Sequence, residues 1–167
     1  MKLLAIFLLL FLSSGFAQQN LNDRLCKENE DIIISFRSSN KKVVTICKDK
    51  SDKHLVYRFG TKDKVELQFS SSLDSKSWQQ FTYSGEWRFG GIQNAGFGNL
   101  SLSFVNLDTK YTVYQTWNDE DSSSDFGLSV SKNHLKARNL VIDKQSKIGS
   151  LLKLNDTKQI KNVALDQ

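Results

Sequence analysis

The sequence YSGEWR combines side chains that often anchor one protein on another, since Trp and Arg are enriched at the energetic centres of interfaces. Trp87 offers a large flat indole, while Glu86 and Arg88 offer charges of opposite sign. We therefore predict a binding loop made of Tyr83, Ser84, Gly85, Glu86, Trp87 and Arg88. Two alternatives are a Trp87 that is buried in the core and an aromatic surface that binds a glycan.

Glycine is concentrated directly after this predicted loop, in the sequence FGGIQNAGFG of residues 89–98. A phosphate-binding loop needs glycines that open a helix, followed by a lysine in the P-loop form. Here a strand pattern follows and no lysine comes after Gly90 and Gly91. We predict no nucleotide and no other cofactor, and interpret the glycines as a flexible corner that allows close backbone approach.

Residues for catalysis or metal binding are scarce. Nucleophilic catalysis normally needs a histidine base, and the chain has only His54 and His134, both of which we expect at hairpin edges. The acidic segment 118–125 lacks the spacing of a calcium loop. We predict no catalytic residue and no metal. An enzyme that uses dispersed acids with one of the histidines is the alternative.

The amino terminus has the form of a secretory signal peptide. Lys2 precedes an apolar run over residues 3–12, and small residues follow before Gln18. The run is shorter than the roughly 20 residues of a membrane span, and no cysteine follows the expected cleavage site after Ala17. We predict a secreted or periplasmic protein without a membrane anchor.

Cys26 and Cys47 are the only cysteines of the chain. Thiols pair in the oxidising compartments that exported proteins enter. Two β-branched runs, residues 31–37 and 42–47, have the pattern of a hairpin, and antiparallel pairing would bring the two cysteines together. We predict a disulfide between Cys26 and Cys47.

The charge balance gives little support for a polyanion partner. The chain has a net charge of +5, and loss of Lys2 with the signal peptide leaves +4. The lysines are scattered and no run of five like charges occurs. We therefore predict an ordinary solvated surface and no nucleic-acid partner.

Short alternating runs predict strands along the whole chain. They comprise residues 31–37, 42–47, 54–59, 65–69, 80–83, 87–89, 100–105, 111–117, 126–131 and 135–142, with an edge strand over 149–154. The serine-rich stretch 70–77 has the pattern of an exposed loop. No helical period with caps is present. The fold class is all-β, a single-domain antiparallel β-sandwich, with a closed β-barrel as the alternative.

The predicted domain organisation follows from these elements. Residues 1–17 are the signal peptide, 18–30 a leader segment, 31–154 the β-sandwich domain and 155–167 a flexible tail. Within the domain we expect Phe36, Phe59, Phe69 and Phe104 in the core, because aromatic residues that alternate in strands are usually buried.

Four segments, LCKENED (25–31), KKVVTIC (41–47), LVYRFG (55–60) and FGNLSLSFVNLDTKYTVYQTW (97–117), together resemble a group of small exported bacterial all-β proteins. The shared pattern includes K-x-V-x-x-C and Y-R-F-G, in the same order and spacing. The group has no assigned activity. The resemblance implies export and an all-β domain. This chain lacks a second cysteine pair of that pattern, with Phe36 at one of its positions.

The small size of the chain, its predicted all-β class and its predicted export together suggest a function by analogy. Small all-β envelope proteins include lysozyme inhibitors and immunity proteins against wall-degrading toxins. We therefore predict a protein-binding domain that acts as an inhibitor or immunity protein against a cell-wall-degrading enzyme. A carbohydrate-binding module that binds a glycan, or an envelope protein with another role, is the alternative.

Overall fold

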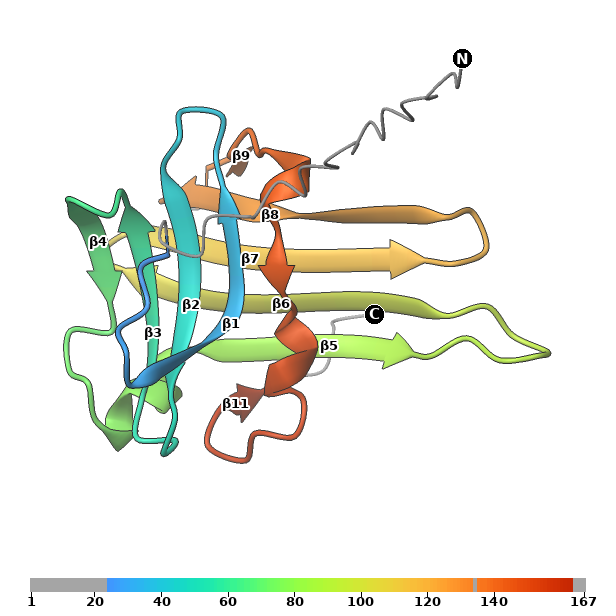
Figure 1. Ribbon diagram of the computed structural model, residues 1–167, viewed down its shortest axis with the longest axis horizontal. Coiled ribbons are helices and arrows are strands. Elements are labelled where there is room, and N and C mark those ends of the chain that lie inside the picture. Colours follow the sequence, from blue (N-terminus) through green and yellow to red (C-terminus); the bar gives the residue numbers. More distant parts are fainter. Residues whose placement is uncertain (1–23, 134, 164–167) are drawn as a thin grey trace, which may run out of the picture.

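The computed structural model describes residues 24–133 and 135–163, and within them the chain forms a β-sandwich. Two sheets pack face to face, and they do not close into a barrel (Figure 1). The predicted β-sandwich is therefore confirmed, and the barrel alternative is not. In Figure 1 the strands of one sheet run crosswise over those of the other.

The first sheet has five strands in the order β10-β1-β2-β3-β4, all antiparallel to their neighbours. These strands are β1 (Glu30–Arg37), β2 (Val43–Asp49), β3 (Leu55–Gly60), β4 (Val65–Phe69) and β10 (Ile148–Gly149). The two-residue β10 pairs with Ile34 and Ser35, so the middle of the β1 edge is hydrogen-bonded rather than open.

The second sheet has six strands in the order β11-β5-β6-β7-β8-β9. They are β5 (Thr82–Arg88), β6 (Phe97–Asn106), β7 (Thr109–Asn118), β8 (Ser123–Lys132), β9 (Arg138–Asn139) and β11 (Lys161–Asn162). Only the β11–β5 pair is parallel. Short 3₁₀ turns complete the described elements: η2 (Ser75–Gln80), η3 (Lys144–Ser146) and η4 (Leu151–Leu154).

The core lies between the sheets and contains a cluster of aromatic rings. Phe104 of β6 stacks on Phe69 of β4 at a centroid distance of 4.3 Å and on Tyr111 of β7 at 5.0 Å. Tyr57 of β3 packs against Phe104 at 4.9 Å. Both sheets therefore contribute rings to this cluster. Each such aromatic pair stabilises the fold by about 0.5–1.5 kcal/mol beyond the effect of the area that it buries.

The four predicted core phenylalanines divide into two groups. Phe36 and Phe104 are buried, as predicted, whereas Phe59 and Phe69 are partly buried and pack against the core from its margin. Both marginal residues belong to strands near the β4 edge, where the sheet covers less of the interior.

The ten-residue strands of the second sheet are longer than any strand of the first sheet. In Figure 1 the hairpins β5–β6 and β7–β8 consequently extend past β1 and β10, and the β5–β6 hairpin reaches furthest. We call residues 86–99 and 116–124 the projecting end. One sheet there has no partner sheet over its inner face.

Three local expectations differ from the structure. Ser70 and Ser77 are fully buried rather than exposed, because η2 packs against β3 and the Ser77 hydroxyl accepts a hydrogen bond from the Leu55 N–H at 3.0 Å. In the expected strand 135–142, only Arg138–Asn139 form a strand, β9, while Ile142 makes an isolated antiparallel bridge to Ser38. The expected edge strand 149–154 is β10 followed by η4.

The described part of the expected tail continues the fold. Ile160 is buried, and β11 pairs with β5. The predicted signal peptide 1–17 and residues 18–23 of the predicted leader lie outside the described residues. Among the residues that are described, no helix is long and apolar enough to span a bilayer.

Candidate functional site

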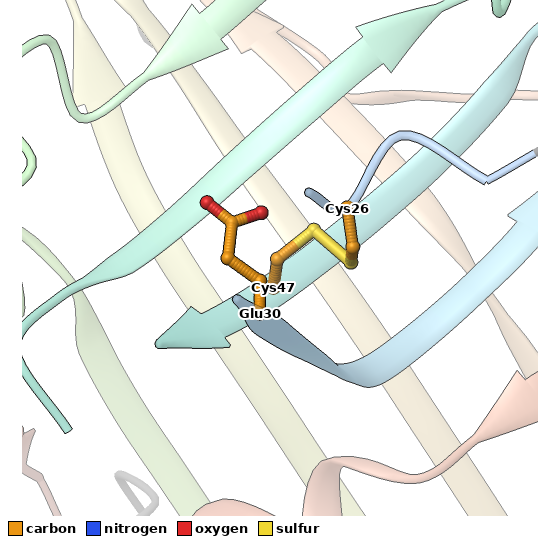
Figure 2. Close-up of side chains that lie close together, drawn as sticks. All are labelled: Cys26, Glu30 and Cys47. Carbon is orange, nitrogen blue, oxygen red and sulfur yellow. A yellow bond between two sulfur atoms is a disulfide. The ribbon is translucent and has the colours of Figure 1, made fainter. Parts of the chain in front are cut away.

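The predicted disulfide between Cys26 and Cys47 is confirmed. It ties the segment before β1 to β2, with a Cα–Cα distance of 5.6 Å. Glu30 lies beside it, as Figure 2 shows, and one ligand-type atom from each of the three residues lies within 4.8 Å of the others. Because the two sulfur atoms are bonded to each other, this cluster is a cross-link in the oxidised protein and offers no thiolate to a metal.

A buried ion-pair network adjoins the disulfide. Tyr57 points into the core, so the next residue, Arg58, points to the opposite face of its sheet. The Arg58 guanidinium donates to both Glu30 carboxylate oxygens, at 2.5 and 2.8 Å. It also donates to the Leu25 carbonyl at 3.0 Å and to the Gln68 side chain at 2.9 Å.

The Glu30 carboxylate is held ionised by its partners. Burial alone would raise its pKa, but hydrogen bonds from Arg58, the Lys27 N–H and His54, together with the Arg58 charge, lower the pKa to about 2. Its side chain is fully buried. This closed set of donors satisfies the carboxylate without leaving an oxygen for a substrate.

The structure corrects the placement of His54. We expected a hairpin-edge position, but the residue is only 4% exposed and its Nε2 lies 3.0 Å from Glu30 Oε1. A histidine enclosed in this way does not face solvent as a general base would. His134, the other histidine, lies outside the described residues.

The six residues of the predicted binding loop form a strand, β5, and not a loop. Their side chains therefore alternate between the two faces of the sheet. Tyr83 is 3% exposed and points into the interior, where burial, with a contribution from Asp156, raises the pKa of its hydroxyl to about 12. Gly85 lies on the same face, and a Cβ there would come within 2.8 Å of Leu100.

Trp87 also lies on the inner face, at the start of the projecting end. Its ring is half-buried against the margin of the core and meets Phe89 edge to face at a centroid distance of 4.8 Å. Its Nε1 donates to Asn155 Oδ1 at 3.0 Å. The indole is therefore held in place by its own chain and is only partly available to a partner.

A second tryptophan lies two strands from Trp87 on the same row. Register pairs Trp87 with Gly98, and Gly98 with Trp117. A Cβ at Gly98 would collide with the Trp117 ring, so glycine is required there for the indole to lie across β6. The row places two half-buried indoles on the inner face of the projecting end.

The remaining predicted residues lie on the outer face. Glu86 and Arg88 are exposed, and Ser84 is half-buried. The Arg88 Nε donates to the Ala95 carbonyl at 3.0 Å, and the guanidinium lies 5.0 Å from the centroid of the Phe97 ring. The predicted site is thus divided: Tyr83, Gly85 and Trp87 face inward, while Ser84, Glu86 and Arg88 face outward.

Two apolar residues at the hairpin tip were missed by the sequence analysis. Phe89 is 70% exposed and Ile92 is fully exposed. The signal was present in the sequence, because both residues lie among glycines, where a strand core is not expected. They are the most exposed large apolar side chains of the projecting end.

The tip is shaped by close backbone approach. The Gly91 N–H donates to the Asn94 carbonyl at 2.8 Å, and the Asp119 N–H donates to the Gly96 carbonyl at 2.9 Å. A Cβ at Gly96 would collide with the Asp119 carboxylate. An open hollow lined by residues 90–96 and Asp119 results.

The projecting end is acidic. It contains four Asp or Glu residues and one Arg, which gives a net charge of −3 within a chain of positive net charge. The acids of the β7–β8 turn, Asp119, Glu120 and Asp121, are all exposed. Hydrogen bonds from Ser123 lower the pKa of Asp121, so this carboxylate is charged at neutral pH.

Comparison with known proteins adds no further assignment: no family model, no curated protein and no solved structure matches the chain. The fold defines the protein as a disulfide-linked β-sandwich with a projecting hairpin. The function must be inferred from its own residues.

Proposed function

We propose that this is an exported protein-binding domain that inhibits a cell-wall-degrading enzyme or confers immunity against one. The proposal rests on the tip of the β5–β6 hairpin, which projects past the body of the sandwich (Figure 1). Phe89 and Ile92, which belong to this tip, are exposed. Exposed apolar groups on a narrow projection are suited to fill a cleft in a partner.

The geometry supports inhibition by occlusion, which needs no catalytic group in the inhibitor. The hairpin would enter the substrate cleft, Phe89 and Ile92 would displace water there, and the surrounding acids would meet a positively charged rim. The tip backbone is already bonded to itself through Gly91 and Asn94, so little ordering would be required on binding.

Export is part of the proposal and has its own support. A disulfide between the only two cysteines is typical of oxidising compartments. A secreted or periplasmic location would bring the protein to enzymes that act on the wall.

The test is inhibition of purified wall hydrolases of several specificities, including muramidases, amidases and endopeptidases, measured as the rate of wall lysis. The oxidised protein should inhibit at least one of them. Phe89→Ala/Ile92→Ala should weaken inhibition by at least tenfold. Val105→Ala/Leu107→Ala, which removes exposed apolar groups elsewhere, is the matched control.

Two results would contradict this proposal. One is an absence of inhibition and of binding across all hydrolase classes. The other is an equal loss of inhibition in both double variants, because the hairpin tip would then have no special role.

A second candidate function, glycan binding, rests on the row of Trp87, Gly98 and Trp117. Flat indoles on one face stack on sugar rings, and both indoles are partly exposed. Titration with soluble wall oligosaccharides should then quench tryptophan fluorescence, and Trp117→Leu should abolish this response. Unchanged fluorescence at millimolar oligosaccharide would exclude this candidate.

A further inference from the structure

A second charged region lies outside the projecting end. We call residues 37–42, 61–66 and 136–147 the basic end. They contain nine Lys or Arg and three Asp or Glu, which gives a net charge of +6. These three segments are far apart in the sequence, so the concentration of charge is a product of the fold.

Backbone contacts join the first and third segments. The Ser39 N–H donates to the Val141 carbonyl at 2.9 Å, and the Asp143 N–H donates to the Arg37 carbonyl at 2.9 Å. The β1–β2 turn therefore lies directly against the chain that returns from β9 to η3.

A hollow joins the first and second segments. Its lining comes from the end of β1, the β1–β2 turn, the start of β2 and the β3–β4 turn: Arg37, Lys41, Val43, Thr61, Lys62 and Asp63. Three of these six side chains are cationic and one is anionic. The basic end is thus a continuous surface with a recess between two hairpin turns.

Most of the cations on this surface have no internal counter-ion. Lys42 pairs with Glu66 at 2.7 Å, and Lys144 pairs with Asp125 at the border with the projecting end. Five further exposed cations form no ion pair with a described residue: Lys41, Lys62, Lys64, Lys136 and Arg138. Grouping unpaired like charges costs free energy, which a bound polyanion would recover.

We propose that the basic end binds a flexible anionic polymer other than nucleic acid, with a negative group on each repeat. The cations lie on three separate segments around a recess, so a single small anion would reach only part of them. Four of the five unpaired cations are lysines, whose long flexible side chains can contact a negative group without requiring one fixed geometry. A flexible chain can enter the recess near Lys41 and Lys62 and continue across to Arg138.

This binding would be governed by charge density and by counter-ion release, so it should weaken steeply with salt. It is independent of the proposed hydrolase partner, because it uses other residues and another partner. If both hold, the protein could be retained on an anionic wall while its projecting end remains available.

The experiment measures binding of the oxidised protein to fluorescent long-chain polyphosphate and to polygalacturonate by anisotropy over a range of salt concentrations. Binding of either polymer at low salt, with no detectable binding of orthophosphate, is expected. Lys41→Glu/Lys62→Glu/Arg138→Glu should reduce affinity at least tenfold. It should also flatten the dependence of log K on log salt by about 2, at about 0.7 per lost contact.

Lys76→Glu/Lys110→Glu/Lys158→Glu is the matched control, with the same change of net charge at exposed cations outside the basic end. It should retain most of the affinity and the salt slope. Equal losses in the two triple variants would overturn the proposal, because net charge alone would then explain binding.

Two further binding measurements distinguish this partner from other polyanions. Stronger binding to phosphatidylglycerol vesicles than to either polymer would assign the surface to a bilayer, with the exposed Leu135 and Val141 as inserted groups. Stronger binding to a single-stranded oligonucleotide of equal charge would assign it to nucleic acid. Either result would overturn the polymer assignment. The triple variants are compared only after their circular dichroism matches that of the unmodified protein.

Discussion

The cluster around Arg58 and the projecting end show two opposite uses of side chains. At Arg58, the charged guanidinium is buried, and it donates hydrogen bonds to the Glu30 carboxylate and to the Leu25 carbonyl. At the hairpin tip, Phe89 and Ile92 are apolar and yet exposed. The first arrangement holds the chain together, because a buried charge without partners is costly. The second contributes little to folding, which is the expected property of a surface kept for a partner.

The largest predicted effect is on the enclosed cluster. Arg58→Ala leaves the Glu30 carboxylate buried without its main partner, so the free energy of unfolding should fall by about 3–5 kcal/mol. Urea denaturation, with Lys76→Ala as an exposed control, measures this difference. A loss below about 1 kcal/mol would show that the network is not structural.

The same cluster should make stability depend on acid. The pKa of Glu30 is lowered to about 2 in the folded protein, below its usual value of 4.5. Its contribution is therefore complete above about pH 4.5 and is lost as the pH falls toward 2, by up to about 3 kcal/mol. Glu30→Gln should flatten the pH dependence of the denaturation midpoint over this range. An unchanged slope would assign the acid sensitivity to other carboxylates.

Removal of the disulfide should have an effect of similar size. Cys26→Ser/Cys47→Ser opens a link between positions 21 residues apart, and should reduce the free energy of unfolding by about 3 kcal/mol. Denaturation of the oxidised protein with and without reductant checks the same quantity without a mutation. If both comparisons show no change, the segment before β1 is held by the Arg58 contacts alone.

A smaller effect is expected within the projecting end. Gly98→Ala places a methyl group where the Trp117 ring lies, and should cost about 1–3 kcal/mol as the indole is displaced. Gly91→Ala, where a Cβ meets nothing within 4 Å, is the control and should be close to neutral. Tryptophan fluorescence should shift in the Gly98 variant only.

Much of the fold could be predicted from the sequence because strand alternation and the two cysteines are local signals. The division of YSGEWR between two faces could not, since Gly85 and Gly98 have the pattern of turn residues. Their actual role depends on Leu100 and Trp117, which approach them from neighbouring strands. A glycine required by a cross-strand contact resembles a turn glycine in the sequence.

The charged regions were missed for a related reason. Arg58 lies in an alternating strand, which predicts exposure, but the segment before β1 covers that face. The cations of the basic end come from three segments that only the fold brings together. Sequence patterns describe one element at a time, and these sites belong to several.

The most direct test of the central claim compares stability and inhibition in one variant. Phe89→Ala/Ile92→Ala should leave the free energy of unfolding within about 0.5 kcal/mol of the unmodified value, because both side chains are exposed. The same variant should lose at least tenfold in inhibition of the hydrolase that the unmodified protein blocks. A clear loss of stability, or full inhibition by the variant, would contradict the assignment of the hairpin tip to recognition.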